Sequence, residues 1–482
     1  MIDNIICRKD EIKELLELYK SKSSQFVVVY GRRRVGKTFL IRELFEEKFT
    51  FYHTALSPIE YNSSELNDLQ INAFVSTLRN KGAIIEHKPE NWFVVFEIFK
   101  KWLNTFSKRK RILLFFDELP WLDTPKSGFI TAFENFWNSY LDGKNVMLIV
   151  SGSAVSWIND NLINSYGGLY DRVTREIKLS QFTLYETEQY IKSKNISMSR
   201  TDILECYMVL GGIPFYLSCL KKGYSLSQNI DNLFFNSNSK LGQEFVRLFG
   251  SQFKNSEEVE KILRFLSGKR IGYTRKEISE KTKISLNGRL TKLLKSLEVS
   301  EFISSYVYFS HSKRDVYYFV SDLFIAFWFY FKEKKIVSKD NFWKTYHKSA
   351  VLTIWRGLAF EQVCFIHKEQ IKKKLGISGV STEFSPWLSK KDENIKLEDK
   401  TKVDMVIQRG DNIVNLCEIK YYNKEFAIDK QYDQELRDKM TIFVEQTKVK
   451  NPQLTIITTY GLKFNEYSNQ VQSVVVLDDL FE

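Results

Sequence analysis

Apolar residues in the first 150 positions form three short continuous runs, each followed directly by polar residues. The first run covers Phe26–Tyr30, the second lies within Arg111–Leu119 and the third covers Val146–Val150. Runs of this kind are typical of strands buried on both faces of a parallel sheet. The amphipathic stretch Thr38–Phe45, which follows the first run, predicts a helix. The amino-terminal part of the chain is therefore predicted to have an α/β fold with a parallel sheet.

The residues after the first predicted strand have the spacing of a phosphate-binding loop, Gly31-x-x-x-x-Gly36-Lys37-Thr38. Glycines let backbone N–H groups curl around phosphate oxygens, and the following helix points its positive end at them. Lys37 is expected to reach the β- and γ-phosphates of ATP, and Thr38 to hold Mg²⁺. The residues expected to contact the nucleotide through this loop are Gly31, Arg32, Arg33, Arg34, Val35, Gly36, Lys37 and Thr38.

Two adjacent acids, Asp117 and Glu118, end the second predicted strand. Ligands of open α/β sheets bind outside the carboxyl ends of the strands, which is where these acids are expected. We predict that Asp117 completes the Mg²⁺ shell through water and that Glu118 orients or deprotonates the attacking water. The loop and the acids together predict a nucleotide-hydrolysing site.

Gly31–Thr38 and Leu113–Glu118 resemble the Walker A and Walker B motifs of AAA+ and related signal-transduction ATPases. Further segments resemble the archaeal-type ATPase family of archaea and bacteria: FFDELPWL at 115–122, IVSGSA at 149–154, LYDRVTREIKLSQF at 169–182 and GGIPFYL at 211–217. The resemblance implies that Ser151 or Ser153 senses the γ-phosphate, and that the arginine finger or sensor is Arg172 or Arg175. It also implies that Pro214 helps to place a lid helix against the nucleotide.

One departure from that family lies near the amino terminus. The family's Gly-Arg pair, in a segment that packs against the adenine, is replaced by Cys7-Arg8. Cysteine lacks the backbone freedom of glycine.

The rest of the amino-terminal half is predicted to be helical. Residues 50–110 are predicted as an insertion of amphipathic helices, whose aromatic residues recur at helical spacing and pack against the sheet: Trp92, Phe93, Phe96, Phe99 and Trp102. An ATPase core at 1–182 is followed by a predicted helical lid at 183–250.

Residues 256–330 have the element order of a winged helix, with three helices followed by a hairpin. The helices are predicted at Val259–Leu266, Thr274–Thr282 and Leu286–Val299, and the strands at Tyr306–Phe309 and Val316–Val320. Basic side chains on the third helix could lie along a groove of DNA, and others in the hairpin could contact phosphate: Arg289, Lys292 and Lys295, then His311, Lys313 and Arg314. Winged helices in such ATPases also mediate intramolecular or protein contacts, and both roles stay open.

The last predicted domain, 335–482, contains a hairpin whose strands are Lys402–Gln408 and Asn412–Lys420. With a three-residue loop centred on Asp411, Asp404 lies opposite Glu418, and Lys420 shares the face of Glu418.

Like charges at such a cross-strand pair are destabilising, so their placement needs an explanation. A divalent cation bound by Asp404 and Glu418 is one explanation, with Lys420 stabilising a phosphate or activating water. Ion pairs with neighbouring lysines are the other.

An acid followed on the next strand by Glu-x-Lys resembles the PD-(D/E)XK nuclease core, and RGLAFEQVCF at 356–365 resembles the first helix of that fold. Together they resemble the carboxyl-terminal domain of unknown function attached to archaeal-type ATPases. The resemblance implies an α/β nuclease-like domain with Asp404 and Glu418 as metal ligands and with Glu361 and Lys420 as further catalytic residues. The nuclease family's proline before the first acid is absent, since Lys402-Val403 stands there.

Composition bears on the partners and the compartment. The net charge of +12 suits an acidic partner such as double-stranded DNA, and suits equally a Lys-rich protein without such a partner. Five cysteines without a C-x-x-C pair predict a reducing cytoplasm. The acidic start is not a signal peptide, and no segment has the length and apolarity of a membrane helix.

Two classes of function follow from these patterns. The first is an ATPase whose nucleotide state controls a winged-helix DNA-binding module and a metal-dependent nuclease-like domain. The second is a nucleotide-switched regulator or scaffold that binds DNA or protein without nuclease activity. Both require ATP and Mg²⁺ and both allow an oligomer or a protein partner, but only the first assigns chemistry to Asp404, Glu418 and Lys420.

Overall fold

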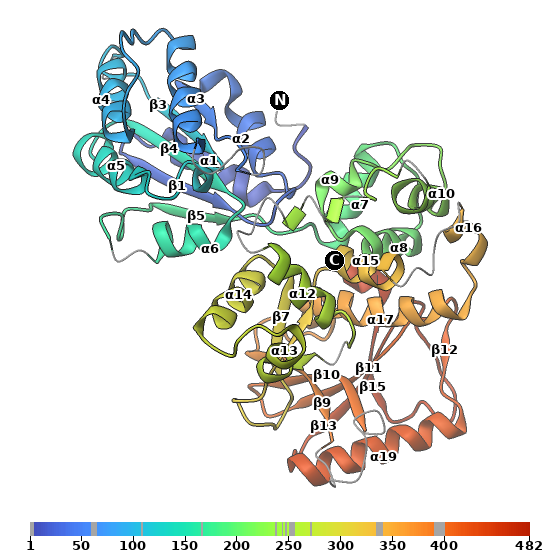
Figure 1. The fold of residues 1–482 in the computed structure, drawn as a ribbon. Helices are drawn as coiled ribbons and strands as arrows, with labels where there is room; N and C mark the ends of the chain where they lie inside the picture. Colours follow the sequence, from blue (N-terminus) through green and yellow to red (C-terminus); the bar gives the residue numbers. More distant parts are fainter. Residues whose placement is uncertain are drawn as a thin grey trace.

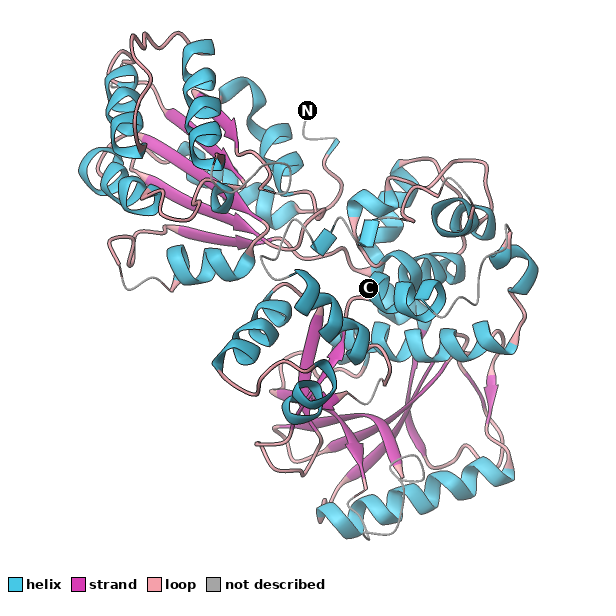
Figure 2. Ribbon diagram, viewed as in Figure 1, coloured by secondary structure: helices cyan, strands magenta, loops and turns pink. Residues whose placement is uncertain are grey.

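The computed structural model describes residues 4–58, 65–107, 109–164, 167–236, 239–242, 244–245, 248–249, 256–269, 272–333, 341–389 and 401–482. The chain passes from an amino-terminal α/β unit through a helical unit and a small helix-and-hairpin unit to a second α/β unit (Figure 1). The two larger sheets lie at opposite ends of the molecule, and helices fill the space between them (Figure 2).

The amino-terminal sheet is parallel, as the sequence predicts, and has the strand order β2-β3-β4-β1-β5. Its strands are β1 (Gln25–Tyr30), β2 (Phe51–Thr54), β3 (Ile112–Asp117), β4 (Val146–Gly152) and β5 (Arg175–Lys178). Alternate residues of β1, β3 and β4 enter two different hydrophobic clusters, one on each face of the sheet. Burial on both faces explains why these strands are continuously apolar in sequence.

Helices cover both faces of this sheet (Figure 1). They are α1 (Lys9–Lys20), α2 (Lys37–Phe45), α3 (Leu66–Asn80), α4 (Trp92–Leu103), α5 (Phe129–Phe136) and α6 (Val155–Ile158), with short turns η2 (Glu46–Lys48), η3 (Leu119–Trp121), η4 (Trp137–Leu141) and η5 (Asn159–Ile163). On α4, four of the five predicted aromatic residues are buried. Phe93 is the exception, with 47% of its surface exposed, because it lies one position off the buried stripe of the helix.

The unit after β5 is helical: α7 (Leu184–Ser193), α8 (Arg200–Leu210), α9 (Pro214–Leu217), α10 (Leu226–Ile230) and η6 (Asp231–Phe235). Both α7 and α8 begin with complete capping boxes, which fix their starts. The boundary predicted near residue 250 and the domain start predicted at 335 lie outside the described residues.

The helix-and-hairpin unit contains α12 (Ser256–Leu266), β6 (Tyr273–Thr274), α13 (Arg275–Thr282), α14 (Gly288–Val299), β7 (Ile303–Val307) and β8 (Val316–Val320). The strands form an antiparallel sheet in the order β6-β8-β7. The predicted order of helices and strands is therefore present. The first hairpin strand lies earlier than the predicted Tyr306–Phe309, because the backbone N–H of Phe309 donates to the carbonyl oxygen of Pro386 rather than to β8.

Three further elements return the chain to the helical unit: α15 (Leu323–Trp328), η7 (Phe329–Glu333) and α16 (Phe342–Tyr346). The last unit contains α17 (Ala350–Ile366), α18 (Lys368–Lys374), β9 (Thr382–Leu388), β10 (Lys402–Arg409), β11 (Val414–Lys420), β12 (Phe426–Ala427), α19 (Lys430–Thr447), β13 (Pro452–Thr458), β14 (Leu462–Lys463), β15 (Val471–Val476) and η9 (Leu477–Phe481). Its five-stranded sheet has the order β15-β13-β11-β10-β9, with α17 between the sheet and the helical unit (Figure 1).

Candidate functional site

The loop after β1 has a backbone that requires glycine at two positions. Gly31 has a φ of +146°, and a Cβ added to it would lie 2.1 Å from the carbonyl oxygen of Leu179. Gly36 has a φ of +94° and is the amino-terminal cap residue of α2. Only glycine adopts such conformations without a steric cost. The loop therefore turns directly into the amino end of α2, which is the arrangement that anion binding requires.

Lys37 is buried at the start of α2, and oxygen atoms surround its ammonium group. Its Nζ donates to the carbonyl oxygens of Gly31 (3.0 Å) and Arg32 (3.2 Å) and to Oγ of Ser153 (2.9 Å). Burial lowers the pKa of Lys37, and the carboxylates of Glu118 and Asp117 oppose this shift. A buried ammonium that is held by oxygens at a helix amino terminus can exchange them for phosphate oxygens.

Thr38 and Asp117 lie together at the carboxyl end of the sheet. The Thr38 hydroxyl is 2.9 and 3.0 Å from the two carboxylate oxygens of Asp117, which also accepts a hydrogen bond from Ser151. Burial raises the pKa of Asp117, and the hydrogen bonds from Ser151 and Thr38 act against that shift. A hydroxyl and a carboxylate are hard oxygen ligands, so this donor set fits Mg²⁺.

Glu118 follows in a left-handed backbone conformation, with a φ of 54°. Its carboxylate accepts from the backbone N–H of Ser153 (2.9 Å) and from the Ser153 hydroxyl (2.5 Å). Ser153 therefore touches both Lys37 and Glu118, whereas Ser151 touches Asp117 and the backbone N–H of Glu118. Of the two serines, the geometry favours Ser153 as the residue that would respond to the γ-phosphate.

A cavity of about 630 Å³ lies beside these residues. Its walls come from the amino-terminal segment, the phosphate-binding loop, the carboxyl ends of β3 and β4 and the helical unit; they include Ile5, Arg8, Phe39, Phe182, Tyr190, Lys194 and Pro214. Apolar and aromatic walls with a few convergent polar groups are typical of small-molecule sites.

Arg8 belongs to one wall of the cavity and follows Cys7, the position that departs from the family's Gly-Arg pair. Cys7 and Arg8 both have positive φ values, 62° and 60°, so the cysteine adopts the left-handed backbone that glycine favours. The Arg8 guanidinium lies 4.9 Å from the centre of the Phe182 ring and donates to the carbonyl oxygen of Ser180. Burial, with Glu186 nearby, raises the pKa of the Cys7 thiol to about 11, so the thiol is neutral.

The helical unit closes the cavity through the segment that begins at Gly212. A Cβ at Gly212 would lie 1.9 Å from the carbonyl oxygen of Phe182, so a side chain there would push the two segments apart. Pro214 starts α9 and lines the cavity, and the Phe215 ring next to it lies 3.9 Å from the Arg34 guanidinium.

Arg172 and Arg175, the predicted finger or sensor residues, lie away from the cavity of their own chain. Arg172 pairs with Asp142 (3.3 Å) and Arg175 pairs with Glu14. Arg175 starts β5 and lies beside Val27 of β1, four residues before Gly31. At ~3.3 Å per residue this is ~13 Å from the loop. The sequence motif identified the two arginines but not where they lie. Because β5 runs parallel to β1, they lie at the amino end of the sheet.

Other arginines lie at the cavity or directly behind the phosphate-binding loop. Arg33 and Arg34 line the cavity with Arg8, and Arg32 is buried behind the loop. Arg32 forms an ion pair with Asp322 (2.8 Å), in which the two side chains are 1% and 3% exposed. Arg34 pairs with Glu244, its Nη2 2.9 Å from Oε2. The sequence analysis assigned these residues to the loop alone, and nothing near them in the sequence indicates these further contacts.

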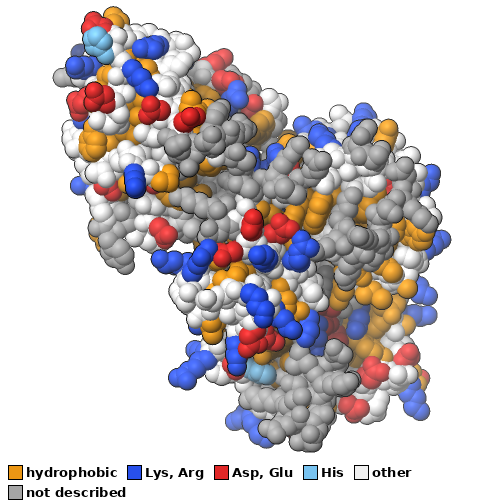
Figure 3. Space-filling model, in the orientation of Figure 1, with side chains coloured by type: hydrophobic (Ala, Val, Ile, Leu, Met, Phe, Trp, Pro, Cys, Tyr) orange, Lys and Arg blue, Asp and Glu red, His pale blue; other side chains and the backbone are white. Residues whose placement is uncertain are grey.

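The basic face of α14 is exposed, and Lys and Arg side chains gather over this region of the surface (Figure 3). Arg289 pairs with Glu258 (2.8 Å). Lys292 and Lys295 line a groove of about 820 Å³ whose other wall is α6 and η5, with Asp160 among its residues. The Ser156 hydroxyl joins the two walls by donating to Ser296 (2.7 Å).

The three basic side chains predicted to contact phosphate from the hairpin loop do not all face solvent. Lys313 and Arg314 are exposed, as contact with phosphate would require. The His311 Nε2 lies 3.0 Å from the carbonyl oxygen of Leu388, so this side chain is directed at β9 rather than at solvent. The backbone N–H of Phe309 donates to Pro386 (3.0 Å), which attaches the hairpin loop to the edge of the second sheet.

The register of the β10–β11 hairpin is the predicted one. Met405 pairs with Cys417 and Gln408 with Val414, so the next position places Asp404 opposite Glu418. Glu418 is buried, and burial together with Asp404 raises its pKa. The pKa of Asp404 moves the other way: Lys402 and the N–H of Ile419 lower it, although burial opposes them.

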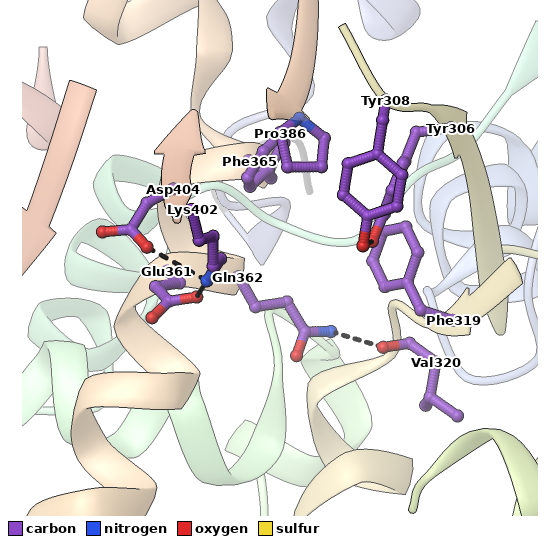
Figure 4. A pocket seen from close by; sticks show the side chains of 10 residues that line it. All are labelled: Tyr306, Tyr308, Phe319, Val320, Glu361, Gln362, Phe365, Pro386, Lys402 and Asp404. Carbon is purple, nitrogen blue, oxygen red and sulfur yellow. Dashed lines mark hydrogen bonds and ion pairs between the residues drawn. The ribbon is translucent and has the colours of Figure 1, made fainter. Parts of the chain in front are cut away.

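Lysines lie against these acids, which is the second of the two explanations given in the sequence analysis. Lys402 Nζ lies 3.0 Å from Asp404 and 3.2 Å from Glu361, between the two carboxylates (Figure 4). Lys439 and Lys420 lie 2.8 and 3.8 Å from Glu418, and Tyr432 donates to it (3.1 Å). Within the described ranges, no three His, Cys, Asp or Glu side chains come close enough together to hold a metal ion. The sequence analysis missed Lys402 and Lys439, although Lys402 stands where the nuclease family's proline is absent.

Tyrosines of the hairpin face this acidic cluster. Tyr306, Tyr308 and Phe319 line a small cavity of about 70 Å³ together with Glu361, Lys402 and Asp404 (Figure 4). Phe309 stacks on Phe443 of α19, with ring centres 5.5 Å apart. The helix-and-hairpin unit therefore covers one side of the cluster.

Residues 6–220 match the model of a family described as an ATPase domain predominantly from Archaea. The uncharacterized protein MJECL04 of Methanocaldococcus jannaschii is 26% identical over 329 residues, which are 67% of each chain. The uncharacterized ATP-binding protein MJ0423 of the same organism is 42% identical over 41 residues, 8% of this chain and 70% of that protein.

Among solved structures, the Walker-type ATPase PABY2304 of Pyrococcus abyssi has a TM-score of 0.47 at 18% identity and covers 68% of this chain and 97% of its own. The ORC2 protein of Aeropyrum pernix has a TM-score of 0.38 at 12% identity, with 68% and 95% covered. In the described part of the chain, no helix combines the length and apolarity that crossing a membrane requires.

Proposed function

We propose that this chain hydrolyses ATP and uses its nucleotide state to control a DNA-binding module in its carboxyl-terminal half. The match of residues 6–220 to an ATPase domain family supports the hydrolysis. Lys37 binds the β- and γ-phosphates and the loop from Gly31 to Thr38 surrounds them with backbone N–H groups. Thr38 and Asp117 hold Mg²⁺, which neutralises phosphate charge when bound. Glu118 orients the attacking water and accepts its proton.

The hydrogen bonds around Glu118 support a switch at this residue. Both carboxylate oxygens accept hydrogen bonds from Ser153, and the Ser153 hydroxyl also accepts from Lys37. When Lys37 turns to phosphate oxygens, it leaves Ser153, and Glu118 can then release Ser153 and turn to water. Ser153 thereby holds the catalytic carboxylate until a nucleotide draws Lys37 away.

The observation that carries the control function is the pairing of two loop arginines with later parts of the chain. Arg32 pairs with Asp322, the cap residue of α15, and Arg34 pairs with Glu244 of the segment before α12. Any change in the loop that accompanies phosphate binding acts directly on both acids. The neighbouring residues of the loop therefore report the nucleotide state to the units that follow.

We propose that α14 is the DNA-contacting helix, through Arg289, Lys292 and Lys295, with Lys313 and Arg314 as phosphate contacts. A helix in the major groove has DNA backbone on both sides. Because α6 and η5 stand beside α14, the two units must separate before α14 can enter the groove. Binding of duplex DNA should therefore depend on the nucleotide.

The test is the affinity of the full chain for a labelled duplex, measured over a salt series with no nucleotide, ADP, ATP and a non-hydrolysable ATP analogue. Changing the three α14 residues to Ala should reduce the slope of log affinity against log salt by about 2 to 3. A matched control changes three exposed lysines of the ATPase core, Lys20, Lys22 and Lys81. Equal slopes in both triple variants would assign α14 to protein contacts, and nucleotide-independent binding would refute the control function.

A metal-dependent nuclease is a second candidate, because Lys402 joins Glu361 to Asp404, and Glu418, opposite Asp404, lies against Lys420 and Lys439. The test is cleavage of duplex DNA by the full chain with Mg²⁺ or Mn²⁺, compared with Asp404→Asn. Cleavage that disappears in the variant supports this candidate. Absence of cleavage in the presence of bound DNA and ATP supports the regulator instead.

A further inference from the structure

The three consecutive arginines of the phosphate-binding loop point to three different surroundings. Arg32 is buried against Asp322, between the rings of Tyr216 and Phe302. Arg34 is held by Glu244. Arg33 lines the nucleotide cavity, with its guanidinium 6.0 Å from the centre of the Trp121 ring.

Arg33 is thus the middle of three arginines, and the arginine on each side of it forms an ion pair. Lys37, Glu118 and Ser153 are among the polar residues that line the same cavity. Desolvation lowers the pKa of Arg33 and the charge of Glu118 opposes this, which places the guanidinium within electrostatic reach of the proposed water-orienting carboxylate.

We propose that Arg33 is an arginine finger supplied by the chain that binds the nucleotide, so that it contacts the γ-phosphate in cis. This inference rests on the hydrolysis proposed above and adds the residue that neutralises the transferring group. Arg172 and Arg175, the arginines suggested by family resemblance, are absent from the cavity wall formed by the described residues.

In the step assisted by Arg33, the oxygen of water forms a bond to the γ-phosphorus. The bond between that phosphorus and the β–γ bridging oxygen breaks, and its electron pair stays on ADP. The proton of water passes to Glu118 and then to phosphate or solvent. Negative charge shifts toward the bridging oxygen and over the γ-oxygens, and a guanidinium at this position stabilises it.

The surroundings of Arg33 make this role possible without assembly. The loop backbone on either side is fixed by Arg32–Asp322 and Arg34–Glu244, and Trp121 offers a ring face to the guanidinium. A preorganised cation needs no movement of a second subunit at the moment of reaction. Hydrolysis per chain should therefore be independent of protein concentration.

The experiment compares steady-state ATP hydrolysis by the full-length wild type, Arg33→Ala and Arg33→Lys, with Arg109→Ala as a matched loss of an exposed arginine at the opposite end of the sheet. Arg33→Ala should lower kcat by on the order of 10³-fold, the effect of removing an arginine finger, with little change in the affinity for a fluorescent ATP analogue. Arg33→Lys should recover only part of the loss, because lysine keeps the charge without the planar fork. Arg109→Ala should behave as wild type.

A mixing experiment separates a finger in cis from one in trans. Arg33→Ala and Glu118→Gln are each impaired at their own site, so a cis finger predicts no activity above the sum of the two when they are combined. Recovered activity in the mixture, or a specific activity that rises with protein concentration, would show that the finger comes from another subunit and overturn the proposal.

Three further outcomes overturn it by different routes. If Arg33→Ala melts like wild type and retains kcat within a factor of two, Arg33 is not the finger while hydrolysis stands. If Arg33→Ala loses affinity for the ATP analogue with kcat unchanged, Arg33 only binds the ground state. A wild-type chain without turnover refutes the proposed hydrolysis and the finger with it.

Discussion

The buried ion pair between Arg32 and Asp322 allows a quantitative test of how the ATPase domain is joined to the rest of the chain. Asp322→Asn removes one charge and keeps nearly the same shape. The amide oxygen can still accept the N–H of Ile325, which Asp322 Oδ1 accepts at 2.8 Å as the cap of α15. The variant therefore isolates the loss of the charge from the loss of the cap.

The magnitude follows from burial. Arg32 and Asp322 are 1% and 3% exposed and 2.8 Å apart, so Asp322→Asn leaves a guanidinium without a countercharge in a site closed to water. Breaking such a pair costs about 3–5 kcal/mol. At about 2–4 °C per kcal/mol, the melting temperature of the unit should fall by ~6–20 °C. Asp68→Asn is the control, because its pair with Lys88 is exposed and worth at most ~1 kcal/mol.

Calorimetry of the full chain is the suitable assay, because it resolves transitions of separate units in a multidomain protein. The double variant Arg32→Met with Asp322→Asn removes both charges and should be less destabilised than Asp322→Asn alone. A drop of less than 2 °C for Asp322→Asn, or a double variant equal to the sum of the singles, would show that the pair does not couple the loop to α15.

Three other outcomes are expected. Lys37→Ala should abolish binding of a fluorescent ATP analogue, while Glu118→Gln should bind it and lose turnover; unchanged ATPase activity in both would contradict the assigned site. Burial lowers the pKa of His53 and of His367 to about 4. The free energy of unfolding should therefore keep its full value above pH 6.5 and fall by about 3 kcal/mol per histidine as the pH drops toward 4. Urea titrations at several pH values should show that His367→Gln flattens this dependence. Asp404→Asn should destabilise the metal-free chain, since it takes a countercharge from Lys402; a higher melting temperature would restore the like-charge explanation.

Much of the fold could be predicted because the decisive signals are local. The phosphate-binding loop needs glycine at fixed positions, and Gly31 and Gly36 have the conformations that explain the pattern. The β10–β11 register follows from a turn centred on Asp411 and was predicted to the residue. Thr274 and Glu277, three positions apart at the start of a predicted helix, form a complete capping box. In each case, residues close together in the chain determine the local backbone conformation.

The contacts that the sequence did not predict join residues far apart in the chain. Nothing near Arg32 indicates Asp322, and nothing near Glu418 indicates Lys439, because ion pairs between units depend on how the units pack. The same holds for Arg172 and Arg175, whose motif was recognised but whose position depends on the direction of β5. Phe93 shows the limit for single helices, since one position on the helix decides between core and solvent.

The two acidic clusters of the molecule differ in how their charge is held, and this difference bears on which of them does chemistry. Asp117 and Glu118 accept hydrogen bonds from Ser151 and Ser153, neutral groups that leave a negative charge available to a cation. In the second cluster, by contrast, lysines lie against each acid: Glu361, Asp404 and Glu418 face Lys402, Lys420 and Lys439.

A divalent cation at the second cluster must therefore displace a lysine that already neutralises it, whereas at the first it need not. Lys402 is the lysine to displace, because it bridges two acids on the side that the hairpin covers. If the hairpin leaves the sheet edge to contact DNA, Tyr306 and Tyr308 leave with it, and Lys402 becomes accessible to a phosphate. Lys402→Met should then make metal binding easier to detect by calorimetric titration with Mn²⁺. No heat of binding in this variant, with or without DNA, would leave the second cluster as a structural element and the ATPase as the enzyme of the chain.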